Sequence, residues 1–413
     1  MNRIACVILF FLLLDFLINQ IADWLNLNGV DTKTPESFIG LYDDITHERS
    51  RRYLRVNTVF GQVSALFSLS VILIFWFSKG FLLLDQWVRG FSLGPVASGM
   101  VFIAVLVLLK TLLSLPFDLY ATFVIEARFG FNRTTWKTWI KDMAKGIVLF
   151  ILLGAPLIAG ILAFFQYAGE YAWLWCWLAV TIFMLFVQFI APTWIMPLFN
   201  RFTPLEDGAL RTAIFNYAGS INFSLDNIFV MDGSRRSLKS NAFFTGFGKN
   251  KRIVLFDTLI EKHTIRELVG ILAHEMGHYK KKHILKMLVA GILQTGAVFF
   301  LMSWFLSYDG LFEAFYLENK SVYAGLIFFG ILYSPMDLVL GVFIRMMSRR
   351  HEYEADRFAA ETSGFADDLS NALKKLSVHN LSNLFPHAFY VFLNYSHPPV
   401  LQRVKAIQTA GSR

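Results

Sequence analysis

The stretch AWLWCWLAVTIFMLFVQFIAPTWIM, residues 172–196, decides the fold class of this chain. It contains no charged residue, and a helix of this length crosses the roughly 30 Å of hydrocarbon in a bilayer. A helix is expected because backbone polar groups in lipid must be satisfied within the segment. Six other segments are similarly long and apolar, at residues 4–23, 59–84, 96–121, 146–168, 285–307 and 321–346.

The sequence therefore predicts an all-α multi-pass membrane protein with about seven transmembrane helices. The composition agrees, because 55% of the 413 residues are hydrophobic and 16% are charged, against about 25% charged in soluble domains. The fourth and fifth segments are joined at Gly169 and Glu170, which predicts a helical hairpin. The first segment lacks a small-x-small cleavage site and contains Asp15, so we expect a retained span and not a signal peptide.

Loop charge predicts the orientation. The net charge of +8 comes from basic residues between apolar runs, and not from one amphipathic face, so no nucleic-acid partner is expected. By the positive-inside rule the N-terminus lies outside and the C-terminus is cytoplasmic. The basic residues that set this orientation are Lys33, Arg49, Arg51, Arg52 and Arg55 in the first loop, and Arg128, Arg133, Lys137, Lys141 and Lys145 in the third.

We divide the chain into four regions. Residues 1–196 carry spans one to five, 197–284 a small cytoplasmic α+β insert, 285–346 spans six and seven, and 347–413 a cytoplasmic C-terminal region. Strands are expected at 227–231 and 252–256, with 240–246 as a candidate edge strand that can lie against an extended substrate. Thr264 and Glu267 fit a capping box at the start of a helix.

Ionisable residues inside the spans indicate either pairing between helices or a wet internal cavity. Asp15, Lys110 and Asp337 lie deep in apolar segments, where facing lipid costs at least a few kcal/mol. The two explanations are left open by the residues alone. The two cysteines, Cys6 and Cys176, lie in apolar runs, so neither a disulfide framework nor a cysteine zinc site is expected.

The expected helix carries the pattern His274-Glu275-Met276-Gly277-His278. Spacing i, i+4 places both imidazoles on one face, so both can bind one zinc ion. Glu275 then lies beside the water that attacks the substrate and can take its proton. The alternative is a surface helix with two solvated histidines, but residues 268–273 are mostly apolar and predict a buried helix.

A zinc peptidase needs a third protein ligand. Residues 348–356, SRRHEYEAD, offer one: in a helix Glu352 and Asp356 share a face while Glu354 points away. We expect Glu352 to bind the single zinc ion and Asp356 to lie behind a ligand or at the reacting bond. The alternative is an ordinary charged helix start next to a basic membrane anchor.

One further histidine can take part in catalysis. His397 lies in the sequence Tyr395-Ser396-His397-Pro398-Pro399, where the prolines predict a stiff turn. A donor on a stiff segment suits an oxyanion that forms only in the transition state. A purely structural histidine in this turn is the alternative.

These motifs resemble the type I CAAX prenyl proteases, which are seven-span zinc metalloendopeptidases. The resemblance covers most of the chain and is carried by motifs in the same order. They are LPF at 115–117, FVIE at 123–126, GFNRTT at 130–135, PTWIMPLFNRFTPL at 192–205, SNA at 240–242, HEMGH at 274–278, SRR at 348–350 with EY at 352–353 and AD at 355–356, and YSHPP at 395–399.

The resemblance implies roles for individual residues. His274, His278 and Glu352 would bind zinc, Glu275 would be the base and Asp356 a proton donor. Asn241 and Ala242 would contact the substrate backbone, and His397 and Arg403 would lie near the scissile bond. It also implies a hydrated chamber within the spans and a substrate that is a peptide or a prenylated protein, from which the last three residues of a C-a-a-X terminus are removed.

Two alternative functions are considered, and the chain differs from the family in one respect that bears on its location. The chain can instead be a quality-control zinc peptidase that degrades misfolded membrane proteins, or a transporter or channel with a vestigial zinc site, although the intact Glu275 argues against the latter. The outer loops are brief and residues 409–413 show no retrieval signal. We therefore expect a bacterial inner membrane, or the endoplasmic reticulum in a eukaryote.

Overall fold

The computed structural model describes residues 2–29, 35–41, 43–225, 227–245 and 252–411. Within this part of the chain, seven helices are long and apolar enough to cross a membrane. The predicted multi-pass helical fold is therefore confirmed. The spanning helices are α1 (Arg3–Asn28), α2 (Asp44–Phe77), α4 (Pro95–Tyr120), α5 with α6 (Trp136–Leu149 and Ala155–Tyr167), α7 (Ala172–Ile190), α12 (His283–Leu306) and α14 (Val322–Ser363).

Three of the spans contain a π-helical segment. These segments continue α4 (Ala121–Glu126), join α5 to α6 (Phe150–Gly154) and continue α7 (Ala191–Ile195) before the short α8 (Met196–Phe199). The predicted hairpin between α6 and α7 turns at a 3₁₀ segment, Gly169–Tyr171, and Gly169 has φ +64°. Glycine adopts this left-handed conformation without a steric penalty, which explains the turn.

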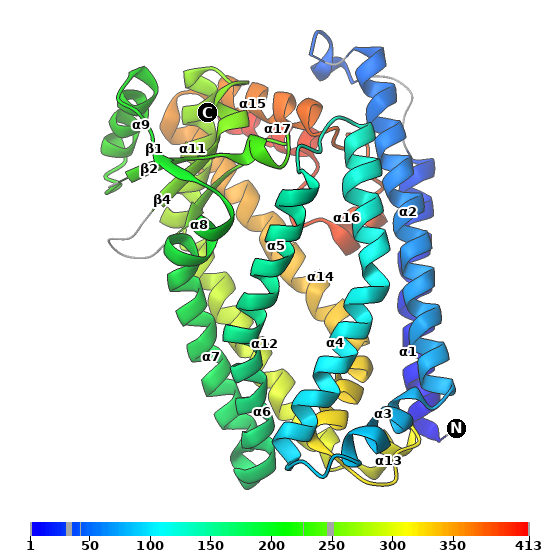
Figure 1. Cartoon of the computed structure of the whole chain (residues 1–413). Coiled ribbons are helices and arrows are strands. Elements are labelled where there is room, and N and C mark those ends of the chain that lie inside the picture. The colour runs from blue at the N-terminus through cyan, green and yellow to red at the C-terminus, as the bar shows by residue number, and fades with distance from the viewer. Residues whose placement is uncertain (1, 30–34, 42, 226, 246–251, 412–413) are drawn as a thin grey trace.

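The N-terminus and the C-terminal region of the chain lie at opposite ends of the bundle of seven spans, as Figure 1 shows. α3 (Gly80–Arg89) and α13 (Asp309–Glu313) lie at the end with the N-terminus. Buried aromatic side chains pack there, for example Phe315 stacked on Phe328 with ring centroids 3.9 Å apart. The opposite end carries the insert and the C-terminal helices, which share a second hydrophobic core.

The insert is an α+β unit, as predicted. Its sheet has the strand order β1-β2-β4-β3, in which β2 and β4 are parallel and the other pairs antiparallel. β3 therefore lies at an edge, and Gly246 at the end of the predicted segment lies outside the described residues. The elements are β1 (Phe202–Pro204), α9 (Ala209–Ser220), β2 (Asn227–Met231), β3 (Ala242–Thr245), β4 (Arg252–Phe256), α10 (Asp257–Ile260) and α11 (Ile265–Lys280).

Ion pairs attach the insert to the membrane helices. Arg236 donates two hydrogen bonds to Asp142 of α5, at 2.9 and 3.0 Å. Lys239 lies 3.0 Å from Glu126, at the end of the π-helical segment that follows α4. These contacts fix the residues just before β3 relative to the spans.

The C-terminal region folds back over the insert. α15 (Ala366–His379), α16 (Ala388–Asn394) and α17 (Val400–Gly411) follow α14, which is 42 residues long. Figure 1 shows α14 running from the end of the bundle that carries the N-terminus to the insert. It continues through residues 346 and 347, the predicted boundary between the spans and the C-terminal region. α14 therefore joins the membrane spans directly to the predicted site.

Candidate metal centre

α11 positions the two histidines of the His-Glu-x-x-His pattern. The predicted capping box is present, because Thr264 and Glu267 bond reciprocally, and Lys375 of α15 lies 2.7 Å from the Glu267 carboxylate. The helix is buried from Glu267 through His274. The predicted burial of this helix is therefore confirmed, against the alternative of a surface helix with two solvated histidines.

Gly277 allows α11 to lie close to α14. A Cβ atom added at Gly277 would be 3.2 Å from both the Cα and the carbonyl oxygen of Ala355, and 3.1 Å from the ring of Phe358. Such distances are shorter than ordinary van der Waals contacts of about 3.5 to 4.0 Å. The absence of a side chain at Gly277 thus brings the histidines next to the acidic residues of α14.

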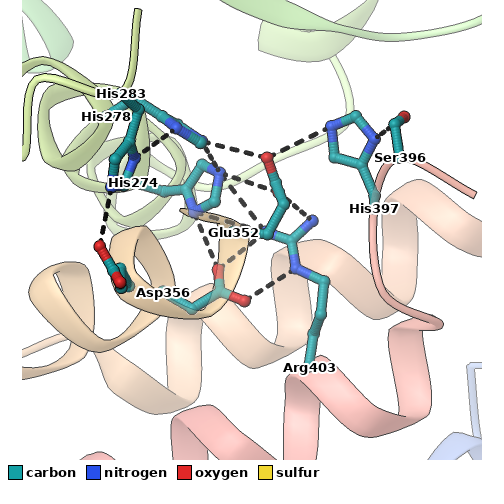
Figure 2. Close-up of polar contacts among 9 residues, drawn as sticks. His274, His278, His283, Glu352, Asp356, Ser396, His397 and Arg403 are labelled. Atoms are coloured by element: carbon teal, nitrogen blue, oxygen red, sulfur yellow. Dashed lines mark hydrogen bonds and ion pairs between the residues drawn. The ribbon is translucent and has the colours of Figure 1, made fainter. Parts of the chain in front are cut away.

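Glu352 of α14 lies between both histidines. His274 Nε2 is 3.4 Å and His278 Nε2 is 3.2 Å from the Glu352 carboxylate, and the two Nε2 atoms are 3.0 Å apart. Figure 2 shows these side chains pointing toward one another. The three residues form a group of potential metal-binding atoms within 4.8 Å of one another.

This donor set fits a zinc ion. Ligands at about 2.0–2.1 Å from one tetrahedral zinc ion are separated by roughly 3.3 Å, close to the spacing seen here. Glu352 Oε2 is buried and accepts no hydrogen bond from the described residues. The Arg403 guanidinium lies 3.3 Å from this oxygen, so the fit to zinc depends on the two imidazoles and the carboxylate and on their spacing.

Asp356 lies one helical turn beyond Glu352 and holds His274 from behind. One of its oxygens is 2.8 Å from His274 Nδ1, and Arg403 of α17 donates to both of its oxygens at 2.7 and 2.8 Å. Asp356 is almost completely buried. These contacts place Asp356 behind His274, the first of its two predicted positions, whereas its role as a proton donor at the reacting bond stays a prediction.

The acidic surroundings favour a cation at His274. Burial lowers the pKa of His274, but the neighbouring Asp356 and Glu352 carboxylates outweigh it and raise that pKa to about 9. Burial raises the pKa of Glu275, and the nearby His274 and His278 offset only part of this increase.

Arg403, which was predicted to contact the substrate, pairs here with two carboxylates. It lies 3.3 Å from Glu352 and 2.7 Å from Asp356.

His397 lies at the edge of the group, in the link between α16 and α17. Its Nε2 is 3.4 Å from Glu352, and its Nδ1 is 2.9 Å from Ser396 Oγ. The side chain is 63% exposed. The turn therefore brings His397 next to Glu352, although His397 lies more than a hundred residues from the two histidines of α11 in the sequence, as Figure 2 shows.

Asn241 and Ala242 lie at the start of the edge strand β3, which contacts α11. The Asn241 side chain accepts a hydrogen bond from the Ala242 N–H at 2.9 Å. Asn241 is exposed and Ala242 is buried. The predicted edge strand is confirmed, whereas its contact with a substrate stays a prediction.

The sequence reasoning missed one histidine at this site. His283, the first residue of α12, contacts His278, with the two Nδ1 atoms 3.0 Å apart. Both rings also line a pocket of about 460 Å³ together with Gln188, Ser348 and His351. Its spacing of five residues from His278 gives no signal of the contact, because a continuous helix would turn His283 to another face.

Comparison with known proteins agrees with this geometry. Residues 24–201 match the family model described as CAAX prenyl protease N-terminal, five membrane helices, and residues 204–410 match that of peptidase family M48. The chain belongs to peptidase family M48. Both the predicted resemblance and the predicted metallopeptidase class are thereby confirmed, and the M48 model includes all three potential ligands.

M48 relatives cover nearly the whole chain. The CAAX prenyl protease 1 homolog of Arabidopsis thaliana is 36% identical, with 96% of each chain covered. CAAX prenyl protease 1 of Saccharomyces cerevisiae is 34% identical over 93% of this chain and 90% of that protein. The crystal structure of S. mikatae Ste24p matches with a TM-score of 0.90 and 32% identity, covering 98% of this chain and 99% of that one.

Proposed function

We propose that this M48 protein is a zinc endopeptidase that removes the last three residues of prenylated C-a-a-X termini. One observation carries the proposal: the donor atoms of His274, His278 and Glu352 converge within 4.8 Å, with Glu275 on the same helical turn. The names of the relatives, CAAX prenyl proteases, support the substrate class. We propose one zinc ion per chain, held by these three residues.

The proposed mechanism is hydrolysis by an attacking water. Bound zinc would act as a Lewis acid and lower the pKa of a coordinated water. The Glu275 carboxylate takes a proton from the attacking water and is then able to return it to the leaving amine. Asp356 accepts a hydrogen bond from His274 Nδ1–H, which leaves the Nε2 lone pair of His274 for the metal.

His397 is proposed to stabilise the oxyanion. If the Ser396 hydroxyl donates to Nδ1, the ring proton lies on Nε2, which faces the three potential ligands. An N–H aimed where charge develops lowers the barrier more than it strengthens substrate binding. Asn241 and Ala242 are proposed to bind the substrate backbone as a neighbouring extended strand, because β3 is at a sheet edge.

The proposed location is a membrane with the metal centre on its cytoplasmic side. The basic loops of the sequence lie at the same end of the bundle as the insert and the C-terminal helices, which supports this orientation. The choice between a bacterial inner membrane and the endoplasmic reticulum stays a prediction.

Cleavage by purified protein tests the proposal. A prenylated C-a-a-X peptide should lose its last three residues, as detected by mass spectrometry, whereas Glu275→Gln should keep zinc and lower turnover by at least about a hundredfold. The quality-control alternative predicts that a misfolded membrane protein is degraded and the prenylated peptide is not. Near-normal turnover by Glu275→Gln would contradict the mechanism.

A further inference from the structure

His283 approaches the metal centre through a break between two helices. α11 ends at Lys280, and Lys282 has φ +58°, a left-handed conformation that turns the chain before α12 begins at His283. The turn directs the His283 ring at the far side of His278, with the two Nδ1 atoms 3.0 Å apart. His283 is held there, because its side chain is 3% exposed and its ring stacks on His351 at a centroid distance of 4.1 Å.

A carboxylate completes this line of contacts. His283 Nε2 lies 3.1 Å from Glu354 Oε2, and the other Glu354 oxygen accepts from Arg350 Nε at 3.1 Å. Figure 2 shows the His278–His283 pair on the side of the site away from His397. Glu354 points away from the three potential ligands, as its helical position predicts, yet it reaches one of them through His283.

We propose that His283 and Glu354 are positioning residues that fix the tautomer and orientation of His278. This inference rests on the proposed role of His278 as a metal ligand. A neutral histidine that binds a metal through Nε2 carries its proton on Nδ1. His278 Nδ1–H then donates to His283 Nδ1, so the proton of His283 lies on Nε2 and is donated to the Glu354 carboxylate. Each hydrogen bond in the line permits only this arrangement.

Both ligand histidines are then oriented in the same way. His274 donates directly to a carboxylate, Asp356, whereas His278 donates to a carboxylate through an interposed imidazole. Partners of this kind typically contribute about 10- to 100-fold to metal affinity. The geometry thus predicts that Glu354, which does not contact the metal group, contributes to zinc affinity.

Competition between the full-length protein and a chelator for zinc tests this inference. Glu354→Ala should weaken zinc binding about 10- to 100-fold, and Glu354→Gln, whose side-chain oxygen still accepts from His283, should restore most of the affinity. Glu361→Ala is the matched control, since Glu361 is an exposed glutamate on the same helix. Melting of the metal-free protein is measured in parallel.

The outcomes separate this inference from the proposed function. If His278→Ala binds zinc as tightly as the unaltered protein, the proposed metal site itself is wrong. If His278→Ala loses zinc but Glu354→Ala keeps full affinity, only the positioning role is overturned. A lower melting temperature of metal-free Glu354→Ala with unchanged zinc affinity would also overturn it, because a purely structural tie predicts that result.

Discussion

Glu352 contacts four other residues of the site. Its carboxylate lies within 3.4 Å of His274, His278, His397 and Arg403. We predict that Glu352→Ala loses zinc on purification, because two imidazoles alone do not complete a zinc peptidase site. Metal analysis checks this, with Glu361→Ala as the control. Equal metal content in the two variants would contradict the ligand assignment.

His397→Ala should separate catalysis from folding. We expect zinc and fold to be kept and kcat to fall about a hundredfold, as the loss of one oxyanion donor does elsewhere, while KM changes less. Single-turnover rates, zinc content and melting temperature measured on one preparation distinguish the roles. A destabilised variant with a normal rate constant would show that His397 is only structural.

Helical periodicity explains which site residues the sequence could predict. Spacing i, i+4 places His274 with His278, and Glu352 with Asp356, on common faces, and the structure brings both pairs together. His283 follows His278 by five residues, which a continuous helix would turn to another face. Only the left-handed residue Lys282 brings the rings together, and a lysine does not indicate such a break.

At the scale of elements, the approach of α11 to α14 depends on Gly277. Gly277→Ala should push against the Ala355 backbone and cost roughly 1 to 3 kcal/mol, as overpacking typically does. We expect lower thermal stability and weaker zinc binding, because the two helices carry different ligands. Gly219→Ala is the control, since a Cβ there meets no atom within 4 Å. Unchanged zinc affinity in Gly277→Ala would contradict this dependence.

The strands show which features of the sheet the local sequence pattern can predict. β2 and β4 have the predicted bounds because both are short apolar runs followed by turn or helix signals. β1, of three residues, and the π-helical segments carry no periodicity of their own and were missed. The parallel pairing of β2 with β4 depends on tertiary contacts, which local pattern does not contain.

At the scale of the whole molecule, orientation is the open prediction. A reporter fused after Arg413 should be cytoplasmic, and one inserted within residues 309–320 should be external, because the basic loops lie at the end of the bundle that carries the insert. Protease protection and reporter activity measure this. Reporters found on the same side would contradict the number of spans.

The fold class followed from the apolar segments, because span length is set by bilayer thickness. The packing of the C-terminal helices did not follow, since α15 and α17 are amphipathic helices whose partners lie in the insert. Arg403 of α17 was expected through the resemblance alone, and no residue pattern indicated its two hydrogen bonds to Asp356.

α14 has a consequence for dissecting this enzyme. At 42 residues, or roughly 63 Å of helix, it is at once a membrane anchor and the carrier of Glu352 and Asp356. A soluble catalytic fragment of this protein cannot be made without truncating that helix. This differs from enzymes in which a flexible linker joins the catalytic domain to the membrane anchor. Inserting one residue into α14 ahead of Glu352 would rotate Glu352 and Asp356 by about 100° about the helix axis. The same helix therefore determines both the position of the site relative to the bilayer and the orientation of its two acidic residues.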